Sequence, residues 1–262
     1  MLRRFLRPAP GDRLVDLGCG SGKVLIWNGD CGAHQVGVDV SPYFSREARS
    51  SVDLVLGDLR ALPFGDGAFT KAYALDVFEH LSRDSLAVML REAARVLVPG
   101  GHLFVYSHVR KNAGVAAGLK AINRLARRLE RWGWIDLEHE RLRKSDHVNP
   151  LADIPDLRRM TAAAGFSIAR ITYYTPLVGG FVENILVRMA ERMIGSGIGG
   201  QGSEIGDGKR TGENRRSAIK ARLSHGGPLY AVLRALTFVM KLDLVLFGRI
   251  ESGPFFALLK KE

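Results

Sequence analysis

The sequence contains few cysteines. Cys19 and Cys31 are the only two among 262 residues, and neither belongs to a CxxC pair. A disulfide framework and a cysteine-rich zinc site are therefore excluded as the basis of the fold. Such sparse use of cysteine is typical of a reducing compartment, and we expect the protein in the cytoplasm.

Long hydrophobic runs are also missing. The most apolar window, Leu229–Gly248, is interrupted by Arg234, Lys241 and Asp243, and a lipid-spanning helix tolerates such charges poorly. The segment 1–13 is basic but lacks an apolar stretch of the length that a signal peptide needs. The sequence therefore predicts neither a membrane span nor a secretory leader.

Negative charge is in short supply. The chain has 27 acidic and 38 basic residues, which gives a net charge of +11. An excess of this size favours an anionic partner, such as RNA, a phospholipid surface or an acidic metabolite. A generally basic proteome would produce the same excess, so charge by itself does not identify a partner.

The first half of the chain does contain a regular alternation of short apolar runs and helical stretches. The runs are rich in β-branched or aromatic residues, which indicates strands. We expect strands at Arg13–Leu17, Gln35–Asp39, Val52–Leu56, Thr70–Asp76 and His102–His108. Ser82–Leu97 has apolar residues at helical spacing and is stopped by Pro99-Gly100. This alternation predicts a mostly parallel sheet wrapped by helices.

The second half is organised differently. Helical patterns occur within Arg110–Lys144 and at Asp153–Ala164, Glu213–Ser224 and Pro228–Leu242, and strand patterns at Phe166–Tyr174 and Phe255–Leu259. The segment Gly195–Gly212 is rich in glycine, and we expect a loop there.

The segment Leu14–Lys23 (LVDLGCGSGK) places three glycines at alternate positions directly after an apolar run. A dinucleotide fingerprint would need a glycine where Lys23 stands, and a P-loop would need Ser or Thr where Val24 stands. The motif therefore indicates a ligand that touches the loop backbone without presenting a phosphate.

This segment resembles the first signature of class I S-adenosylmethionine-dependent methyltransferases, the Rossmann-like group. Further segments match the same pattern in register: Val36–Ser41 (VGVDVS), Leu56–Leu62 (LGDLRAL), Ala72–Leu81 (AYALDVFEHL) and Arg95–Val105 (RVLVPGGHLFV). Together they cover about residues 12–108 and are similar to the small-molecule branch of the type-11 domain family. The resemblance implies an α/β, Rossmann-like, seven-stranded sheet that is mostly parallel with an antiparallel last strand, with helices on both faces and helical insertions on the acceptor side.

The resemblance also implies S-adenosylmethionine as the cofactor. In such a site Asp16 binds the methionine ammonium, Asp39 the ribose hydroxyls and Asp58 the adenine amino group. The full set of implied contacts is Asp16, Gly18, Cys19, Gly20, Gly22, Asp39, Val40, Asp58, Leu59, Asp76 and Val77. Each carboxylate has an alternative role in forming a turn at a strand end, but three such turns beside an accidental glycine motif are a weaker interpretation.

Absent motifs narrow the choice of acceptor. The sequence DVFE at 76–79 stands where a (D/N)PPY segment would mark methylation of amide or base nitrogens, and neither cysteine is placed as the nucleophile of a cytosine methyltransferase. We therefore expect no DNA substrate. Because in-line methyl transfer draws much of its rate from alignment and desolvation, a base is needed only where the acceptor must lose a proton.

Three residues are candidates for catalysis: Glu79, His80 and His147. Glu79-His80 resembles the acid–histidine pair of the small-molecule branch, in which the histidine is a general base or a contact to the methionine carboxylate. A local hydrogen bond at a helix start is an equally open role for His80. His147 lies between Asp146 and Asn149; we interpret this trio as a surface turn and expect no metal site.

A basic amphipathic helix is predicted near 115–132. Its apolar residues are Val115, Leu119, Ile122, Leu125, Ala126 and Leu129, its basic residues are Lys120, Arg124, Arg127, Arg128 and Arg131, and Trp132 and Trp134 follow. Such a helix can lie on anionic lipid head groups or pack as a lid over an acceptor pocket. A second apolar stripe, at 229–240, is open to the same two interpretations, and packing in the core or at a dimer interface is the commoner explanation of such a stripe.

We therefore predict a single methyltransferase domain over 1–262, with a cofactor-binding core at 12–109, a helical insertion at 110–152 and a helical, glycine-rich insertion at 176–252. The predicted function is methyl transfer to a small or lipid-like acceptor, in the cytoplasm or peripherally at an anionic membrane surface. Two alternatives stay open: an RNA methyltransferase, which the charge favours, and a non-catalytic module that binds the cofactor.

Overall fold

The structure of the protein is a computed structural model, which describes residues 1–110, 116–135, 147–173, 181–187, 235, 238, 241–242, 244–246, 248–251 and 253–262. The chain divides into two compact units. The sheet unit comprises residues 1–114, 142–174 and 249–262, and the helical unit comprises residues 115–141 and 175–248. The expectation of one domain with two insertions stays a prediction.

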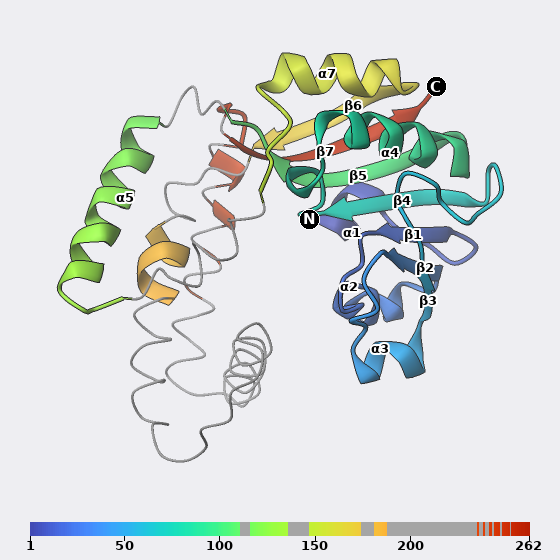
Figure 1. The fold of residues 1–262 in the computed structure, drawn as a ribbon, viewed down its shortest axis with the longest axis horizontal. Helices are drawn as coiled ribbons and strands as arrows, with labels where there is room; N and C mark the ends of the chain where they lie inside the picture. Colours follow the sequence, from blue (N-terminus) through green and yellow to red (C-terminus); the bar gives the residue numbers. More distant parts are fainter. Residues whose placement is uncertain are drawn as a thin grey trace. The chain divides into compact units, whose positions relative to one another are not determined.

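The sheet unit is built on seven strands. They are β1 Arg13–Leu17, β2 His34–Asp39, β3 Asp53–Leu56, β4 Phe69–Leu75, β5 Leu97–His108, β6 Phe166–Tyr173 and β7 Pro254–Lys261. Their order is β3-β2-β1-β4-β5-β7-β6 (Figure 1). The strands β1 to β5 pair in parallel, whereas β7 is antiparallel to both of its neighbours. This arrangement confirms the predicted Rossmann-like fold.

Helices precede or connect the strands of this unit. In the described part of the chain they are α1 Leu2–Leu6, α2 Lys23–Trp27, α3 Arg46–Ser51, α4 Arg83–Val96 and α7 Ile154–Ala163, with single 3₁₀ turns η1 at Gly29–Cys31 and η2 at Phe78–His80. The helix α4 begins after Ser82, whose hydroxyl accepts from the Ser85 amide, and α7 begins after Asp153, whose carboxylate accepts from the Asp156 amide. These caps pair amides that a helix start leaves without a partner.

The helix α1 is a structural feature that the sequence analysis does not predict. Five residues are too few for a helical period to be recognised. Its conformation is stabilised by burial, because Leu2, Phe5 and Leu6 pack with Leu14 and Phe104 of the sheet.

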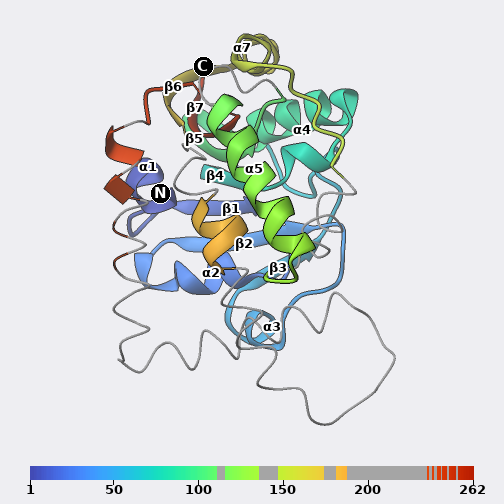
Figure 2. The same ribbon diagram turned by 90° about the vertical axis from the view of Figure 1, so that its left-hand side faces the viewer.

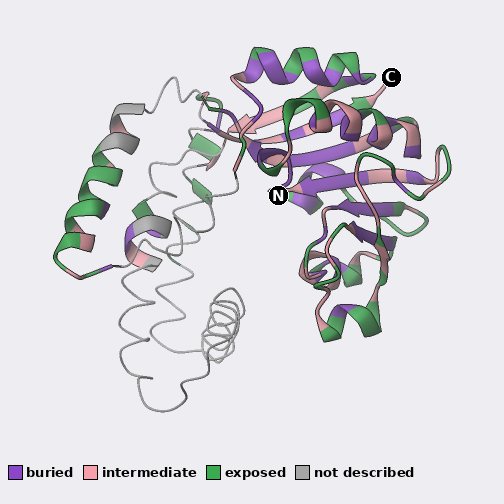
Figure 3. Cartoon of the chain, viewed as in Figure 1, coloured by how far each residue is buried: buried purple, intermediate pink, exposed green. Residues whose placement is uncertain are grey.

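Helices cover both faces of the sheet. In β1, Val15 packs in a cluster with residues of α4 and α7, whereas Leu14 packs with residues of α1 and α2. Figure 2 shows α4 on one side of the strands and α1 and α2 on the other. Figure 3 shows buried strands between helices whose outer surfaces are exposed. Burial on both faces explains why the strand sequences are nearly continuous apolar runs.

The start of β5 differs from the prediction. The strand was expected from His102, after a turn at Pro99-Gly100, but β5 begins at Leu97 and continues through that turn. Its pairing with β4 shifts register between Phe69 and Lys71, and Gly100 has a φ of 73°. An irregular, bulge-like step therefore carries the strand through residues that the sequence indicates as a turn.

In the helical unit, the structure describes α5 (Ala116–Arg131) and η3, a π-helical segment (Val182–Val187). The helix α5 confirms the helix expected in the basic stretch. A small hydrophobic core of the helical unit contains Ala126 of α5, together with Ile135 and Ile185. The elements expected at 195–212 and 213–224, and most of the one at 228–242, lie outside the described residues. None of the helices that the structure describes combines the length and apolar character of a membrane span.

Candidate functional site

The glycine loop, residues 18–22, joins β1 to α2 where the strand order reverses. The chain leaves β1 for β2 and β3 on one side, and then returns to β4 on the other side of β1. Open α/β sheets bind ligands at such a reversal, beyond the carboxyl ends of the strands. The Gly18 and Cys19 amides both donate to the Val38 carbonyl, at 2.8 and 3.1 Å, which holds the loop against the end of β2.

The glycines of this loop have different roles. Gly18, Gly20 and Gly22 have φ values of 81°, 52° and 80°, a region that side chains disfavour. A Cβ on Gly18 would lie 2.6 Å from Val77 Cγ2, and one on Gly22 would lie 2.6 Å from Ala48 Cβ. A Cβ on Gly20 would meet nothing within 4 Å. Packing of the protein itself therefore requires Gly18 and Gly22, whereas Gly20 leaves an open backbone face for a ligand.

Asp39 ends β2 and contacts the glycine loop. Its Oδ2 accepts from the Gly20 amide and its Oδ1 from the Ser41 amide, both at 2.8 Å. Because a carboxylate has about four lone-pair sites, each oxygen keeps room for a further donor. The next residue, Val40, is 77% exposed. This pair suits a ligand that carries both hydroxyl donors and an apolar ring.

Asp16 lies deeper, within β1, and is only 2% exposed. Burial raises the pKa of its carboxyl to about 8; the Tyr73 hydroxyl partly opposes this rise, and the charge of Asp39 adds to it. Although it influences Asp16, the Tyr73 hydroxyl oxygen has no hydrogen bond of normal geometry within the described part of the chain. Asp16 is therefore a carboxyl that gains its charge most readily when a cationic group approaches.

Burial also perturbs the side chain of Cys19. Burial, together with the charges of Asp16 and Asp39, raises the pKa of its thiol to about 12. A thiol with so high a pKa does not provide a thiolate nucleophile at neutral pH. Cys19 is therefore a packing residue of the loop, and its side chain lies 2.8 Å from where a Cβ on Gly37 would stand.

Asp58 differs from the other two carboxylates because a neighbour already occupies it. Arg60 donates to Asp58 from its backbone amide at 2.8 Å, from Nε at 3.0 Å and from Nη2 at 2.6 Å. These contacts hold the pKa of the Asp58 carboxyl below its usual range. Asp58 thus forms the local turn that the sequence left open as its alternative role. Leu59 beside it packs against the main core.

Asp76 marks an abrupt change of direction after β4. The expected strand includes Asp76, but β4 ends at Leu75 and Asp76 has a φ of 53°, uncommon for a residue with a side chain. Its amide donates to the Tyr106 carbonyl at 3.1 Å. This turn buries Val77 and leads directly into η2.

Glu79, in η2, is 2% exposed and connects two other segments. The Ser107 hydroxyl donates to its Oε2 at 2.8 Å, and His108 Nδ1 lies 3.8 Å from its Oε1. Its backbone carbonyl accepts from the amides of Val148 and Asn149, at 2.7 and 3.0 Å. Glu79 thereby links the end of β5 and the segment before α7 to the end of β4.

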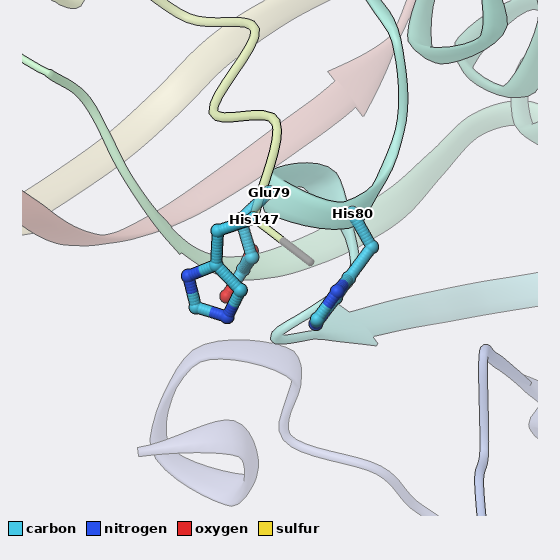
Figure 4. Close-up of side chains that lie close together, drawn as sticks. All are labelled: Glu79, His80 and His147. Atoms are coloured by element: carbon cyan, nitrogen blue, oxygen red, sulfur yellow. The ribbon is translucent and has the colours of Figure 1, made fainter. Parts of the chain in front are cut away.

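These links bring the histidines together. The rings of His80 and His147 lie edge to face with 4.8 Å between their centroids, and the His108 ring is 5.6 Å from that of His147. Ligand atoms of Glu79, His80 and His147 all lie within 4.8 Å of one another (Figure 4). We term Glu79, His80, His108 and His147 the histidine cluster. Such a group can exchange a proton with a ligand or bind a metal ion.

An ion pair between a half-exposed arginine and a buried carboxylate fixes the segment that carries His147. Arg83 in α4 donates to Asp156 in α7 through both Nη atoms, at 2.8 and 2.7 Å, and also to the Pro150 carbonyl at 3.4 Å. The Asp156 side chain is 3% exposed, and the Arg83 guanidinium holds the pKa of this carboxyl well below its usual range.

By sequence alone, Glu79-His80 and His147 are separate candidates, and the structure places them side by side. Ser107 and His108 were not among the predicted site residues. Both stand at the end of a strand parallel to β4, and this position at the ligand-binding edge is the signal that could have identified them. Asp146 lies outside the described residues.

Comparison with known proteins gives three findings. Residues 15–105 match the family model described as "Methyltransferase domain". The "Probable tRNA methyltransferase 9B" of Bos taurus is 36% identical over 108 residues, which cover 40% of this chain and 23% of that protein. The "Demethylmenaquinone methyltransferase" of Corynebacterium kroppenstedtii is 39% identical over 107 residues, which cover 39% of this chain and 44% of that protein. The chain thus spans less than half the length of these curated relatives.

A solved structure extends the likeness of fold to the whole chain. Phosphoethanolamine N-methyltransferase 2 of Haemonchus contortus, in complex with S-adenosyl-L-methionine, has a TM-score of 0.54 at 18% identity. The match covers 99% of this chain and 51% of that chain. At this identity the likeness concerns the fold. The family match at 15–105 includes the glycine loop, Asp39, Glu79 and His80, whereas His147 lies beyond it.

Proposed function

We propose that the protein is a class I, Rossmann-like, S-adenosylmethionine-dependent methyltransferase that transfers a methyl group to a small or lipid-like acceptor, on the basis of the methyltransferase domain matched at residues 15–105. The observation that carries the proposal is the open face of Gly20, with the Asp39 carboxylate bonded to its amide. The acceptor side of the proposal depends on the histidine cluster at the same edge of the sheet.

The residues of the glycine loop and its surroundings fit S-adenosylmethionine, which supplies a methyl group activated by a positively charged sulfur. Asp39 keeps capacity for the two ribose hydroxyls beyond the amides it already accepts. Asp16 suits the methionine ammonium, directly or through water, because a cation there compensates the cost of its burial. The exposed Val40 and the partly buried Leu59 offer apolar surface for adenine.

His80, Glu79 and His147 are the proposed catalytic group. His80 is exposed and His147 half-buried, so an acceptor can reach both imidazoles. Glu79 and His80 follow the turn at Asp76 and Val77, directly after β4 and at the reversal of strand order, and His147 joins them from the segment before α7. An imidazole in this place can accept the proton that an acceptor hydroxyl or amine must lose. Glu79, through its backbone and carboxylate contacts, positions them.

A lipid-like acceptor is supported by the end of α5. Trp132 and Trp134 are 68% and 56% exposed, and they follow a last turn that contains Arg128 and Arg131. Exposed tryptophans beside basic residues are suited to an anionic membrane surface, with the rings at the level of the lipid head groups. We therefore propose a cytoplasmic protein that contacts such a membrane peripherally.

An RNA acceptor is the second candidate. Arg124, Arg127, Arg128 and Arg131 line one hollow of the helical unit together with Glu130, and clustered arginines also bind phosphates. One relative is named as a probable tRNA methyltransferase. The same arginines thus serve either proposal, and only the methylated product separates them.

The test is transfer of label from methyl-labelled S-adenosylmethionine to fractionated cell extract. We expect label in the organic, lipid-soluble fraction, and none with the Asp39→Ala variant. Label confined to RNA would replace our proposal by the second candidate. Binding of S-adenosylhomocysteine without transfer to any fraction would indicate a cofactor-binding module instead of an enzyme.

A further inference from the structure

We propose that Glu79, His80 and His147 bind one divalent transition-metal ion, of the kind that prefers two imidazoles and one carboxylate. Their ligand atoms lie within 4.8 Å of one another although the residues come from two separate segments of the chain. Figure 4 shows the His147 side chain entering from the loop before α7 and the other two from η2.

The convergence of these side chains is enforced by the backbone. The Val148 and Asn149 amides both donate to the carbonyl of Glu79 itself, at 2.7 and 3.0 Å. His147 is therefore fixed next to the residue whose carboxylate would share the ion with it. Two hydrogen bonds to one carbonyl make this placement a property of the fold and not of a freely moving loop.

Glu79 has the environment of a metal-binding carboxylate. It is 2% exposed, and in the described part of the chain its one ion-pair contact is His108, at 3.8 Å. A buried carboxylate needs a positive partner close by. The Ser107 hydroxyl occupies Oε2 at 2.8 Å, which orients the group and leaves Oε1 directed toward His108. Hydrogen bonds that orient a carboxylate in this way are typical of metal ligands.

A further buried oxygen supports a bound ion or its water. Asn149 Oδ1 has no hydrogen-bond partner among the residues that the structure describes. Asn149 is bonded through its amide to Glu79 and has a φ of 50°, an uncommon conformation. An unpaired buried oxygen beside the cluster is costly unless an ordered water or an ion compensates it.

The chemistry of the donors restricts the ion. Zinc bonds to imidazole nitrogen and carboxylate oxygen are about 2.0–2.2 Å long, so donors that share an ion lie about 3–4 Å apart. Closing a spacing of up to 4.8 Å requires side-chain movements of about 1 Å, which are within the reach of small side-chain rotations. Two imidazoles favour zinc, iron, cobalt or nickel over magnesium or calcium, which take oxygen ligands.

Three protein ligands leave positions open for an acceptor oxygen, and this step rests on the proposed function. A bound divalent ion lowers the pKa of a coordinated hydroxyl. The O–H bond then breaks with the proton leaving to water, and the oxygen keeps the electron pair that forms the new bond to the methyl carbon as the carbon–sulfur bond breaks onto sulfur. In the loaded protein the imidazoles are ligands, so water and not an imidazole would take the proton, because the ion lowers the pKa of the coordinated hydroxyl.

The experiment measures metal binding without any methyl transfer. The full chain, without a histidine tag and stripped with EDTA, is titrated with Co²⁺, followed by its visible absorption, and Zn²⁺ is then added as a competitor. We expect one equivalent of Co²⁺, displaced by Zn²⁺. His147→Ala and His80→Ala should each weaken Co²⁺ binding by at least about tenfold, since each removes a ligand.

His34→Ala is the matched control, because His34 is an exposed histidine at the start of β2, paired with Asp53. It should leave Co²⁺ binding unchanged. Equal Co²⁺ binding in all variants, or no absorption in the wild type, would overturn the metal site. S-adenosylhomocysteine binding is measured on the same samples. In the histidine variants, retained binding shows that the sheet unit is folded. In the wild type, Co²⁺ binding without S-adenosylhomocysteine binding would contradict the proposed function and leave the metal site standing.

Discussion

The glycine loop and the histidine cluster lie at the same edge of one sheet, but they are stabilised in different ways. In the glycine loop, residues 18–22 take their shape from local backbone conformation, and within the described residues their one distant side-chain partner in hydrogen bonding is Asp39 of the adjacent strand. The histidine cluster has no such local origin. It combines η2, the end of β5 and the segment before α7, which are joined through Glu79.

This difference has a functional meaning. A loop built from backbone geometry suits a ligand that is always the same, since its contacts do not depend on adjustable side chains. A cluster assembled from three segments can be altered by changing any one of them, and under the proposed function this would suit the acceptor, the variable partner in a methyl transfer. Substitutions in the glycine loop and substitutions in the histidine cluster should therefore have separable effects.

The greatest loss is expected from Gly18→Ala. The new Cβ combines a φ of 81° with a 2.6 Å contact to Val77, so we expect destabilisation by about 1–3 kcal/mol and no measurable S-adenosylhomocysteine binding. Thermal unfolding and calorimetry measure both. Gly11→Ala is the control, because Gly11 has a φ of 89° but nothing within 4 Å of a Cβ. Equal effects of the two variants would contradict the packing role of Gly18.

A smaller loss is expected from Asp39→Ala, with Asp58→Ala as its counterpart. Asp39 has free capacity and bonds the loop, so its removal should weaken S-adenosylhomocysteine binding by about 100-fold, the effect of losing charged hydrogen bonds. Asp58 is occupied by Arg60, and its removal should cost no more than about threefold. Calorimetry measures the S-adenosylhomocysteine affinity of both variants. A larger loss of affinity in Asp58→Ala than in Asp39→Ala would show that Asp58, and not Asp39, is the main cofactor contact.

A pH effect is expected from Asp16. Its pKa is about 8 in the fold against about 3.9 unfolded, so the folded state holds an extra proton between these values, and stability falls as pH rises from about 4 to about 8. A cationic ligand group requires the ionised form, so S-adenosylmethionine affinity should increase by up to about tenfold per unit between pH 6 and 7.5. Asp16→Asn should flatten both the dependence of unfolding free energy on pH and the dependence of S-adenosylmethionine affinity on pH. If both proteins show the same pH dependence, Asp16 is not the group that titrates.

The smallest effect on the cofactor is expected from Arg83→Ala. It leaves the Asp156 carboxylate without its main partner and should destabilise the protein by about 1–3 kcal/mol, a value reduced by the half-exposed position of Arg83. S-adenosylhomocysteine affinity should stay within about twofold, while Co²⁺ binding weakens because the His147 segment loosens. Arg91→Ala, on the exposed side of the same helix, is the control. If Arg83→Ala weakened S-adenosylhomocysteine binding as much as Co²⁺ binding, the glycine loop and the histidine cluster would be coupled.

Several elements were predictable at nearly residue precision. The strand β1 has the expected bounds, Arg13–Leu17, because an apolar run bordered by turn residues has few alternatives. The helix α4 lies within the expected Ser82–Leu97 for a similar reason, with a serine cap at its start. The bulge in β5 and the short helix α1 were not predictable, since both depend on pairing and burial against distant residues.

The sequence by itself determined the sheet, its order of elements and the glycine loop with its carboxylates, because apolar periodicity and glycine conformation are local constraints that the residue types express directly. Only the tertiary structure decided that Ser107 and His108 reach Glu79 and that His147 stands beside His80. These facts depend on which strand ends meet at one edge and on two amides that bond one carbonyl. No pattern of neighbouring residues encodes such distances.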